Sequence, residues 1–433
     1  MGVVNYILND LGATVFMPLM LIIIGLLLRL RIVDTISDGL MLGMGIFIIK
    51  NVSKLMENAM SPVVTSFSEQ TGSNLDIIDV GWPVCEAIAF ACPYIFACFI
   101  IAIAVNAVML VMKWTNCLNI DIFNFWYLSE TCIFVYVLTN KLWLAFAMCV
   151  VQVVLQLKIA ESMSQHCRKL TGIKNVTASV PPMMSIMFVY PAELILRKIP
   201  FLNKDMSIDA IHEKYGDFFS PHVMGFLVGT ILSLLARYSI AQSLQNGIVM
   251  GAVLYALPIL SQMFMKAFMR ISEKLSSALQ GKFGDRDFCI GLDWPFLGGR
   301  AEMWLCNVLV TPFALAMALI LPNVRVIFLV TMGSYVTHAA LVATGANLLH
   351  MIILGIAFQP IAIYFASYVA PLITEVATMY NAYEVTAGQM ITGSVACPEL
   401  RFVMFELCQG RLMGVFRPGW LCRRGVCLLP LHE

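Results

Sequence analysis

Two short stretches of the sequence place an aspartate close to a tryptophan and a proline. Asp79 begins DVGWP (79–83), and Asp293 lies within GLDWP (291–295). A carboxylate among apolar residues can hydrogen-bond a hydroxyl group of a small polar solute, and it can accept a proton as a general base. An aspartate two residues before a proline also suits a helix cap, because Asp is favoured at the N-cap and Pro in the first turn. For Asp293 the residues alone leave solute contact and helix capping open.

A third stretch, NIDIFNFWYLSE (119–130), combines polar and aromatic residues. Asp121 and Asn124 are three residues apart and therefore share one face of a helix. Their carboxylate and amide groups offer the mixture of acceptors and donors that the hydroxyl groups of a polyol need. Trp126 and Tyr127 can stack on the C–H faces of a sugar. An aromatic belt at the membrane interface together with a helix cap explains the same spacing equally well.

The composition of the chain is that of a membrane protein. Hydrophobic residues make up 60% of the 433 residues and charged residues only 12%, whereas soluble domains carry about 25% charged residues. Val326–Thr374 contains no Asp, Glu, Lys or Arg. Because a helix needs about 20 apolar residues to cross a bilayer, that run alone holds about two spans. The fold class is predicted to be an all-α polytopic membrane protein.

About ten to twelve hydrophobic segments follow one another along the chain, and some of them are unsuited to a simple span. Segment 39–50 contains Gly43 and Gly45, and segment 178–196 contains three prolines. Non-helical backbone at membrane depth persists only where protein or a water-filled cavity covers it. Interrupted segments of this kind mark the substrate path in many transporters. We therefore expect re-entrant or broken helices, with packed kinks that play no part in transport as the alternative.

Polar side chains within the apolar segments are nearly all acids and amides. Ionisable groups are costly in a bilayer, and they usually face a cavity or a partner. The set comprises Glu86, Asp121, Glu130, Glu193, Asn106, Asn124, Gln152, Gln156, Asn307, Asn347, His338 and His350. Since no Lys or Arg lies deep among them, the sequence argues against an anionic substrate held by ion pairs.

Other features narrow the possible functions. The connection 266–302 carries the densest basic cluster, so the positive-inside rule predicts that it is cytoplasmic. Val15–Leu28 is expected to be a retained segment, because no positively charged region precedes it. A net charge of +1 leaves no basic footprint for nucleic acid. GFLVG (225–229) is expected to serve close helix packing.

The sequence contains no motif for binding a metal ion or a nucleotide. The thirteen cysteines form no C-x-x-C pair, and the six histidines form no H-x-x-H. Buried reduced thiols and no metal site are therefore expected, and no cofactor is predicted. The chain also lacks a G-x-x-x-x-G-K-[ST] loop for nucleotide phosphates.

Several long motifs resemble one family of bacterial permeases. They are DVGWP (79–83), NIDIFNFW (119–126), IDAIHEKYGDFFSPHVMGFLVG (208–229), KFGDRDFCIGLDWPFLGG (282–299) and ANLLHMIILGIA (346–357). Together they resemble the membrane IIC component of galactitol-type permeases of the sugar phosphotransferase system. The resemblance runs from about residue 5 to about residue 410. We divide the chain into a permease domain, 1–415, and an atypical basic tail, 416–433.

The resemblance implies a fold, a location and a reaction. It implies a multi-pass protein of the bacterial inner membrane, related to the ascorbate permeases, which are homodimers with an elevator-type core and scaffold. It also implies that a polyol such as galactitol is phosphorylated as it is translocated. The phosphoryl donor would be a phosphocysteine on a separate IIB protein, itself charged by IIA, so this chain would be the transport subunit of the complex. Its other partners would be membrane lipid and a second copy of the chain.

The resemblance also places the GLD aspartate of this superfamily near the substrate. Asp293 is therefore the first candidate for substrate contact and the candidate general base, and Asp79 is the second. The full predicted substrate-binding set is Asp293, Asp79, Asp121, Asn124, Trp82, Tyr127 and Glu130.

The sequence departs from the family pattern in three places. Tyr127 stands where family members tend to carry a histidine, and VTASVPP (176–182) replaces a PHG-like stretch. The tail 416–433 resembles no apolar span, and a cytoplasmic tail and a shifted reading frame explain it equally well. Two other function classes stay open. One is an ion-coupled secondary transporter, with Glu86, Glu130 and Glu193 as ion sites, and the other is a non-transporting membrane scaffold.

Overall fold

The computed structural model describes most of the chain from residue 12 to residue 410. The described residues are 12–71, 77–80, 85–86, 88–89, 92–119, 126–172, 175–202, 213, 216–283, 288–292, 297, 300–322, 324–327, 335–380, 383, 385, 390–393 and 397–410. Helices dominate this part of the chain, which confirms the predicted all-α class. Four of the described helices are long and apolar enough to cross a membrane: Leu142–Thr171, Ile240–Leu257, Ala301–Ile320 and Leu348–Met379.

The chain consists of two halves with the same order of elements. The first half runs α2 (Gly12–Leu27), α3 (Ile32–Thr71), β1 (Ile77–Asp79), α5 (Ile95–Val111), β2 (Cys117–Asn119), α6 (Trp126–Thr139), α7 (Leu142–Thr171), β3 (Val176–Ala178), η3 (Pro181–Ser185) and α8 (Ile186–Leu196). After η4 (Gly216–Phe219), the second half runs α10 (Pro221–Leu235), α11 (Ile240–Phe283), β4 (Cys289–Leu292), α13 (Ala301–Ile320), β5 (Val326–Ile327), α14 (Thr337–Thr344), α15 (Leu348–Met379), β6 (Met390–Thr392) and α16 (Pro398–Cys408). This order identifies an internal structural repeat, which is common among transporters.

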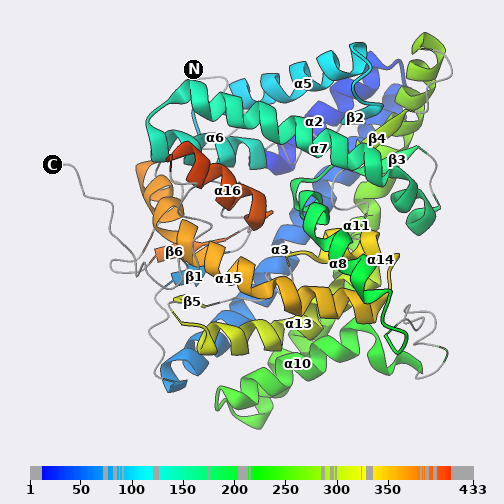
Figure 1. Cartoon of the computed structure of the whole chain (residues 1–433). Helices are drawn as coiled ribbons and strands as arrows, with labels where there is room; N and C mark the ends of the chain where they lie inside the picture. Colours follow the sequence, from blue (N-terminus) through cyan, green and yellow to red (C-terminus); the bar gives the residue numbers. More distant parts are fainter. Residues whose placement is uncertain are drawn as a thin grey trace.

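The two halves exchange their central strands. β1 of the first half lies between β5 and β6 of the second half, and β4 of the second half lies between β2 and β3 of the first half. All four pairings are parallel, with Asp79 opposite Thr392 and Leu292 opposite Ala178. Figure 1 shows the two small sheets at opposite sides of the molecule. Each sheet is therefore completed only when both halves are present.

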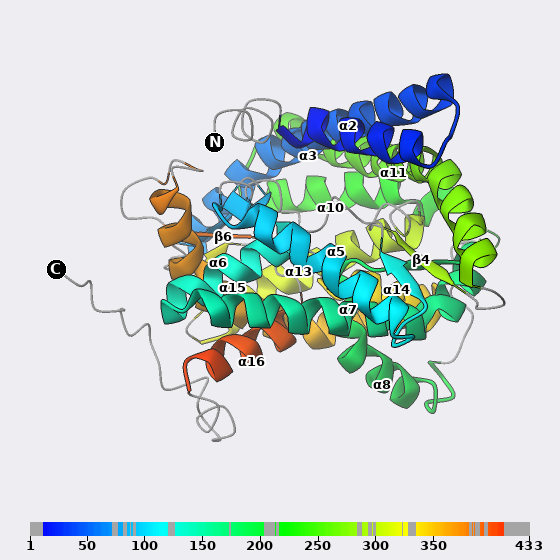
Figure 2. The same cartoon turned by 90° about the horizontal axis from the view of Figure 1, so that it is seen from above.

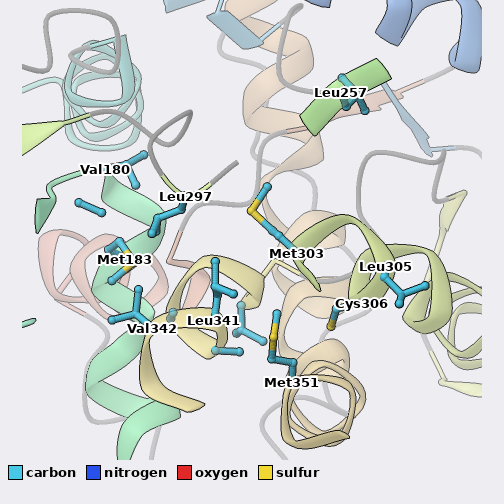
Figure 3. Close-up of a cluster of buried hydrophobic side chains, with 14 of the residues drawn as sticks. Val180, Met183, Leu257, Leu297, Met303, Leu305, Cys306, Leu341, Val342 and Met351 are labelled. Atoms are coloured by element: carbon cyan, nitrogen blue, oxygen red, sulfur yellow. The ribbon is translucent and has the colours of Figure 1, made fainter. Parts of the chain in front are cut away.

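The helices form two layers that the views in Figures 1 and 2 distinguish. One layer contains α2, α3, α10 and α11, which pack extensively against one another, and the other contains the remaining long helices of both halves. The core between η3, α13, α14 and α15 is apolar. Figure 3 shows Met183, Met303, Leu341 and Met351 gathered there, and each is at most 2% exposed.

Glycines bring α10 and α11 into close contact. A Cβ atom on Gly229 would lie 3.2 Å from the Cα of Gly247, and one on Gly247 would lie 2.7 Å from the carbonyl oxygen of Phe226. The small residues of 225–229 thus serve helix packing, as the sequence predicted.

Three expectations about segments differ from the structure. Residues 39–50 do not form a short interrupted segment, because they lie inside the 40-residue helix α3. Packing outweighs the low helix propensity of glycine here, since a Cβ on Gly39 would meet Ile22 at 2.5 Å. Residues 266–283, predicted to belong to a loop, continue α11 as a helix. The proline-rich segment is not broken in its middle: it starts at η3 with Pro181 and Pro182, continues directly into α8, and contains Pro191 inside that helix.

Gly247→Ala is expected to destabilise the protein. The added methyl group would force α10 and α11 apart, which typically costs about 1–3 kcal/mol, and the melting temperature of the detergent-solubilised protein should fall by several degrees. The matched control is Ala252→Val on the exposed side of α11, which should leave the melting temperature nearly unchanged. Equal melting temperatures for Gly247→Ala and the unsubstituted protein would show that the helix contact is looser than described.

Candidate functional site

The two aspartate stretches follow the central strands of the two sheets. Asp79 is the last residue of β1, and residue 293 comes directly after the last residue of β4. Asp79 is 1% exposed, and the amide that follows it, of Val80, donates to the carbonyl oxygen of Thr392 at 2.8 Å. Asp293, Trp82, Asp121 and Asn124 lie outside the described residues. Both stretches therefore begin where a strand of one half ends between strands of the other half.

A buried ion pair joins the two halves of the chain. Arg401 of α16 donates to Glu130 of α6 through Nη1 at 2.6 Å, and each side chain is 2% exposed. Nη2 of Arg401 donates to the carbonyl oxygen of Tyr127 at 3.1 Å. Two predicted site residues, Tyr127 and Glu130, are thus bound by Arg401.

The aromatic residues at the start of α6 stack on each other. The ring centroids of Trp126 and Tyr127 lie 3.7 Å apart with an interplanar angle of 24°, and the guanidinium carbon of Arg401 lies 5.6 Å from the Tyr127 centroid. Tyr127 is only 8% exposed. Stacking of Tyr127 on a sugar stays a prediction that requires the ring to change its neighbours.

A buried carboxylate of α16 contacts both halves. Glu399 accepts a hydrogen bond from the Tyr335 hydroxyl at 2.6 Å and another from Ser185 of η3 at 3.2 Å. Burial raises the pKa of the Glu399 carboxyl, while the hydrogen bonds from Tyr335 and Ser185 lower it in part. The first turn of a helix also favours a negative charge. Neither Glu399 nor Arg401 was among the residues predicted from the sequence.

A polar network lies at the ends of the strands in the other sheet. The Ser179 hydroxyl donates to Oδ1 of Asn119 at 2.8 Å. The backbone N–H of Asn119 donates to Oδ1 of Asn106 at 3.0 Å. Gln156 of α7 donates to the Ser179 carbonyl oxygen. These bonds fix the edge of the sheet directly before residue 293.

A buried histidine holds α15 against α8. Both carboxylate oxygens of Glu193 lie 2.9–3.0 Å from Nδ1 of His350, and the carbonyl oxygen of Leu202 lies 3.2 Å from Nε2. Both ring nitrogens of His350 therefore face oxygen atoms of the protein. Arg197 also donates to Glu193 at 2.8 Å, so the charge of this carboxylate is compensated within the protein.

Among the described residues, three thiols form the one group of three or more His, Cys, Asp or Glu side chains whose ligand atoms lie close enough together to hold a metal ion. The Sγ atoms of Cys98, Cys132 and Cys149, on α5, α6 and α7, all lie within 4.8 Å of one another, and the three residues are fully buried. A structural zinc site uses four ligands, and no further candidate ligand joins these thiols among the described residues. Small apolar side chains packed at a helix junction account for the arrangement.

Comparisons with known proteins identify the family of this chain. Residues 6–387 match the EIIC-GAT family, described as the sugar-specific permease component of the phosphotransferase system. This chain belongs to the EIIC-GAT family. It is 30% identical over 397 residues to the galactitol-specific EIIC component of Escherichia coli K12, an alignment that covers 90% of this chain and 86% of the relative. It is 27% identical over 380 residues to a putative permease IIC component of the same strain, with 86% of each chain covered.

Membership of the EIIC-GAT family confirms the resemblance found in the sequence motifs. The chain is thus a membrane permease component of a sugar phosphotransferase system, and such a component works with IIA and IIB proteins. The roles of the predicted site residues stay predictions.

One expectation about the interior of this EIIC-GAT chain was wrong, because a buried cation is present. The sequence suggested that no cation lies deep in the protein, but Arg401 is 2% exposed. The lone arginine in the apolar stretch LRFVMFEL (400–407) was the available signal. Because Glu130 neutralises Arg401, the pair adds no net charge to the interior.

Arg401→Met is expected to destabilise this permease strongly. It leaves the Glu130 carboxylate buried without its cation, which typically costs about 3–5 kcal/mol. The double variant Glu130→Leu/Arg401→Met should recover much of the lost stability, because no uncompensated charge remains. Thermal unfolding in mild detergent measures both effects, with the exposed Arg168→Met as control. Additive losses in the double variant would contradict a direct pairing.

Proposed function

We propose that this chain translocates galactitol or a related polyol across the bacterial inner membrane and presents it for phosphorylation by a separate IIB protein. The observation that carries the proposal is the family match over residues 6–387, together with 30% identity to a galactitol-specific EIIC component over 90% of the chain. Tyr127 and VTASVPP (176–182) depart from the family pattern, which is why the proposal names a class of polyols.

The chemistry proposed for the site is phosphoryl transfer to a bound hydroxyl group. The hydroxyl oxygen attacks the phosphorus of a phosphocysteine on IIB, the S–P bond breaks, and the cysteine leaves as a thiolate. Asp293 accepts the proton of the attacking hydroxyl group. Asp79 supports this placement, since it lies at the end of β1 as residue 293 lies after β4. Substrate sites of repeat-built transporters lie where the repeats meet.

The charges of the interior favour a neutral substrate. Arg401 is matched by Glu130, and the Glu193 carboxylate is matched by Arg197. A neutral polyol can therefore enter without a compensating ion, whereas its phosphorylated product carries negative charge and finds no unmatched cation among these groups. This difference favours release of the product to the cytoplasm.

We also propose that the protein works as a homodimer with an elevator-type motion. The division of the helices into a layer of α2, α3, α10 and α11 and a second layer supports a fixed scaffold and a moving core. The basic residues of 266–302 support a cytoplasmic location for that end of α11.

Polyol uptake is expected to require the phosphotransferase proteins. Membrane vesicles that contain this chain but lack IIB should bind labelled galactitol and accumulate no phosphorylated product. Adding IIA, IIB and their phosphoryl donor chain should produce galactitol phosphate inside the vesicles. Accumulation of free polyol in response to a proton or sodium gradient alone would instead establish an ion-coupled transporter.

Asp293→Asn is expected to separate binding from chemistry. The amide keeps the size of the side chain and much of its hydrogen bonding, but it removes the charge and the basicity. Binding of galactitol should weaken modestly, since a bond to a charged group contributes about 1.5–3 kcal/mol, while phosphorylation should fall by roughly 10²–10⁴-fold. Asp293→Ala should impair both. If Asp293→Asn transports normally and Asp293→Ala only lowers the melting temperature, the residue is a helix cap.

A further inference from the structure

Gln152 is a buried amide that the proposed chemistry has not used. It lies on α7, about three turns from the start of the helix, and it is 1% exposed. Neither Oε1 nor Nε2 has a hydrogen-bond partner among the described residues. Leaving buried donors and acceptors without hydrogen bonds destabilises the folded protein. A buried amide of this kind therefore indicates a ligand that supplies the missing hydrogen bonds.

The neighbours of Gln152 on α7 show which way this face of the helix points. One turn earlier, the Cys149 thiol donates to the carbonyl oxygen of Leu128 on α6 at 3.5 Å. One turn later, Gln156 donates to the carbonyl oxygen of Ser179. Because α6 and α7 are consecutive and run in opposite directions, Gln152 faces the interior between the first turn of α6 and the end of β3.

A second unsatisfied donor belongs to the first turn of α6. The indole nitrogen of Trp126 is buried and has no partner among the described residues, and the residue is 1% exposed. Gln152 thus offers a donor and an acceptor, and Trp126 offers a further donor, at one end of α6. Hydroxyl groups on adjacent carbons can accept from and donate to such a set, whereas an anion would leave the amide oxygen facing negative charge.

The second half of the chain repeats this placement. Gln359 lies on α15, the counterpart of α7, also about three turns from the start of the helix, and it is 0% exposed. Its presence in the corresponding helix indicates that a buried amide at this depth belongs to the repeated design. In proteins built from such repeats, the substrate site lies at the interface between the halves.

We propose that the side-chain amide of Gln152 hydrogen-bonds hydroxyl groups of the translocated polyol. The inference rests on the proposed function, because it assigns a contact within that polyol site. It makes Gln152 a specificity-determining residue, since the paired donor and acceptor of an amide distinguish a polyol from a charged solute of the same size.

The test compares Gln152→Met with the unsubstituted full-length protein in mild detergent without IIB. Two quantities are measured: the melting temperature without polyol, and the binding of labelled galactitol, sorbitol, mannitol and arabitol. Gln152→Met keeps the length of the side chain and removes its polar atoms. We expect it to keep or raise the melting temperature without polyol, and to weaken binding of the preferred polyol at least about tenfold. The stabilisation by saturating polyol should shrink accordingly.

Gln156→Met is the matched control one turn away. Because Gln156 has a partner in Ser179, its loss should lower the melting temperature without polyol. If Gln152→Met lowers the melting temperature as Gln156→Met does, or binds polyol as tightly as the unsubstituted protein, the assignment of Gln152 is wrong while the polyol function stands. If the unsubstituted, folded protein binds none of the four polyols, the proposed function fails, and the Gln152 contact fails with it.

Discussion

The exchange of strands between the two halves is the constraint on which the rest of the structure depends. β1 hydrogen-bonds to β5 and β6, and β4 hydrogen-bonds to β2 and β3, so each sheet contains strands of both halves. A parallel strand pair needs a long connection, and here the connections are the membrane helices themselves. The exchange therefore positions Asp79 at the end of one central strand and residue 293 after the other. The same strand exchange explains why the polar side chains of α16 contact α6 and η3.

The positions of the buried charged residues follow from this strand exchange. Arg401 and Glu130 come from different halves and lie 2.6 Å apart, both excluded from solvent. A buried pair contributes less to stability than its short distance suggests, because desolvation offsets the attraction. Its value here lies in specificity, since only the correct docking of α16 on α6 compensates both charges. The contact between Glu193 and His350 likewise joins α8 to α15.

Composition alone was sufficient to predict the membrane class and the all-α fold, because long apolar runs have few other uses. The prolines of 178–196 did not mark a break, because Pro181 and Pro182 lie at the start of the helical segment, where proline is tolerated, and Pro191 lies inside α8. The prediction for Gly43 and Gly45 was wrong, because tertiary packing overrides a small propensity cost. The strands were missed because each has only two to four residues, too few for an alternating pattern, and their partners are far apart in sequence. Arg401 was missed for a similar reason: its partner lies on a distant helix that no local spacing reveals.

The strand exchange also dictates the order in which the protein can be assembled during synthesis. β2 and β3 precede β4 in the chain, so both partners of β4 have been synthesised before it. The partners of β1 are made much later, because β5 and β6 are synthesised roughly 250 and roughly 310 residues after it, on the order of tens of seconds at typical translation rates. Throughout that interval the main-chain groups of Ile77–Asp79 lack their final partners. The first half is therefore the part of the chain that depends most on the insertion machinery for protection before the second half arrives.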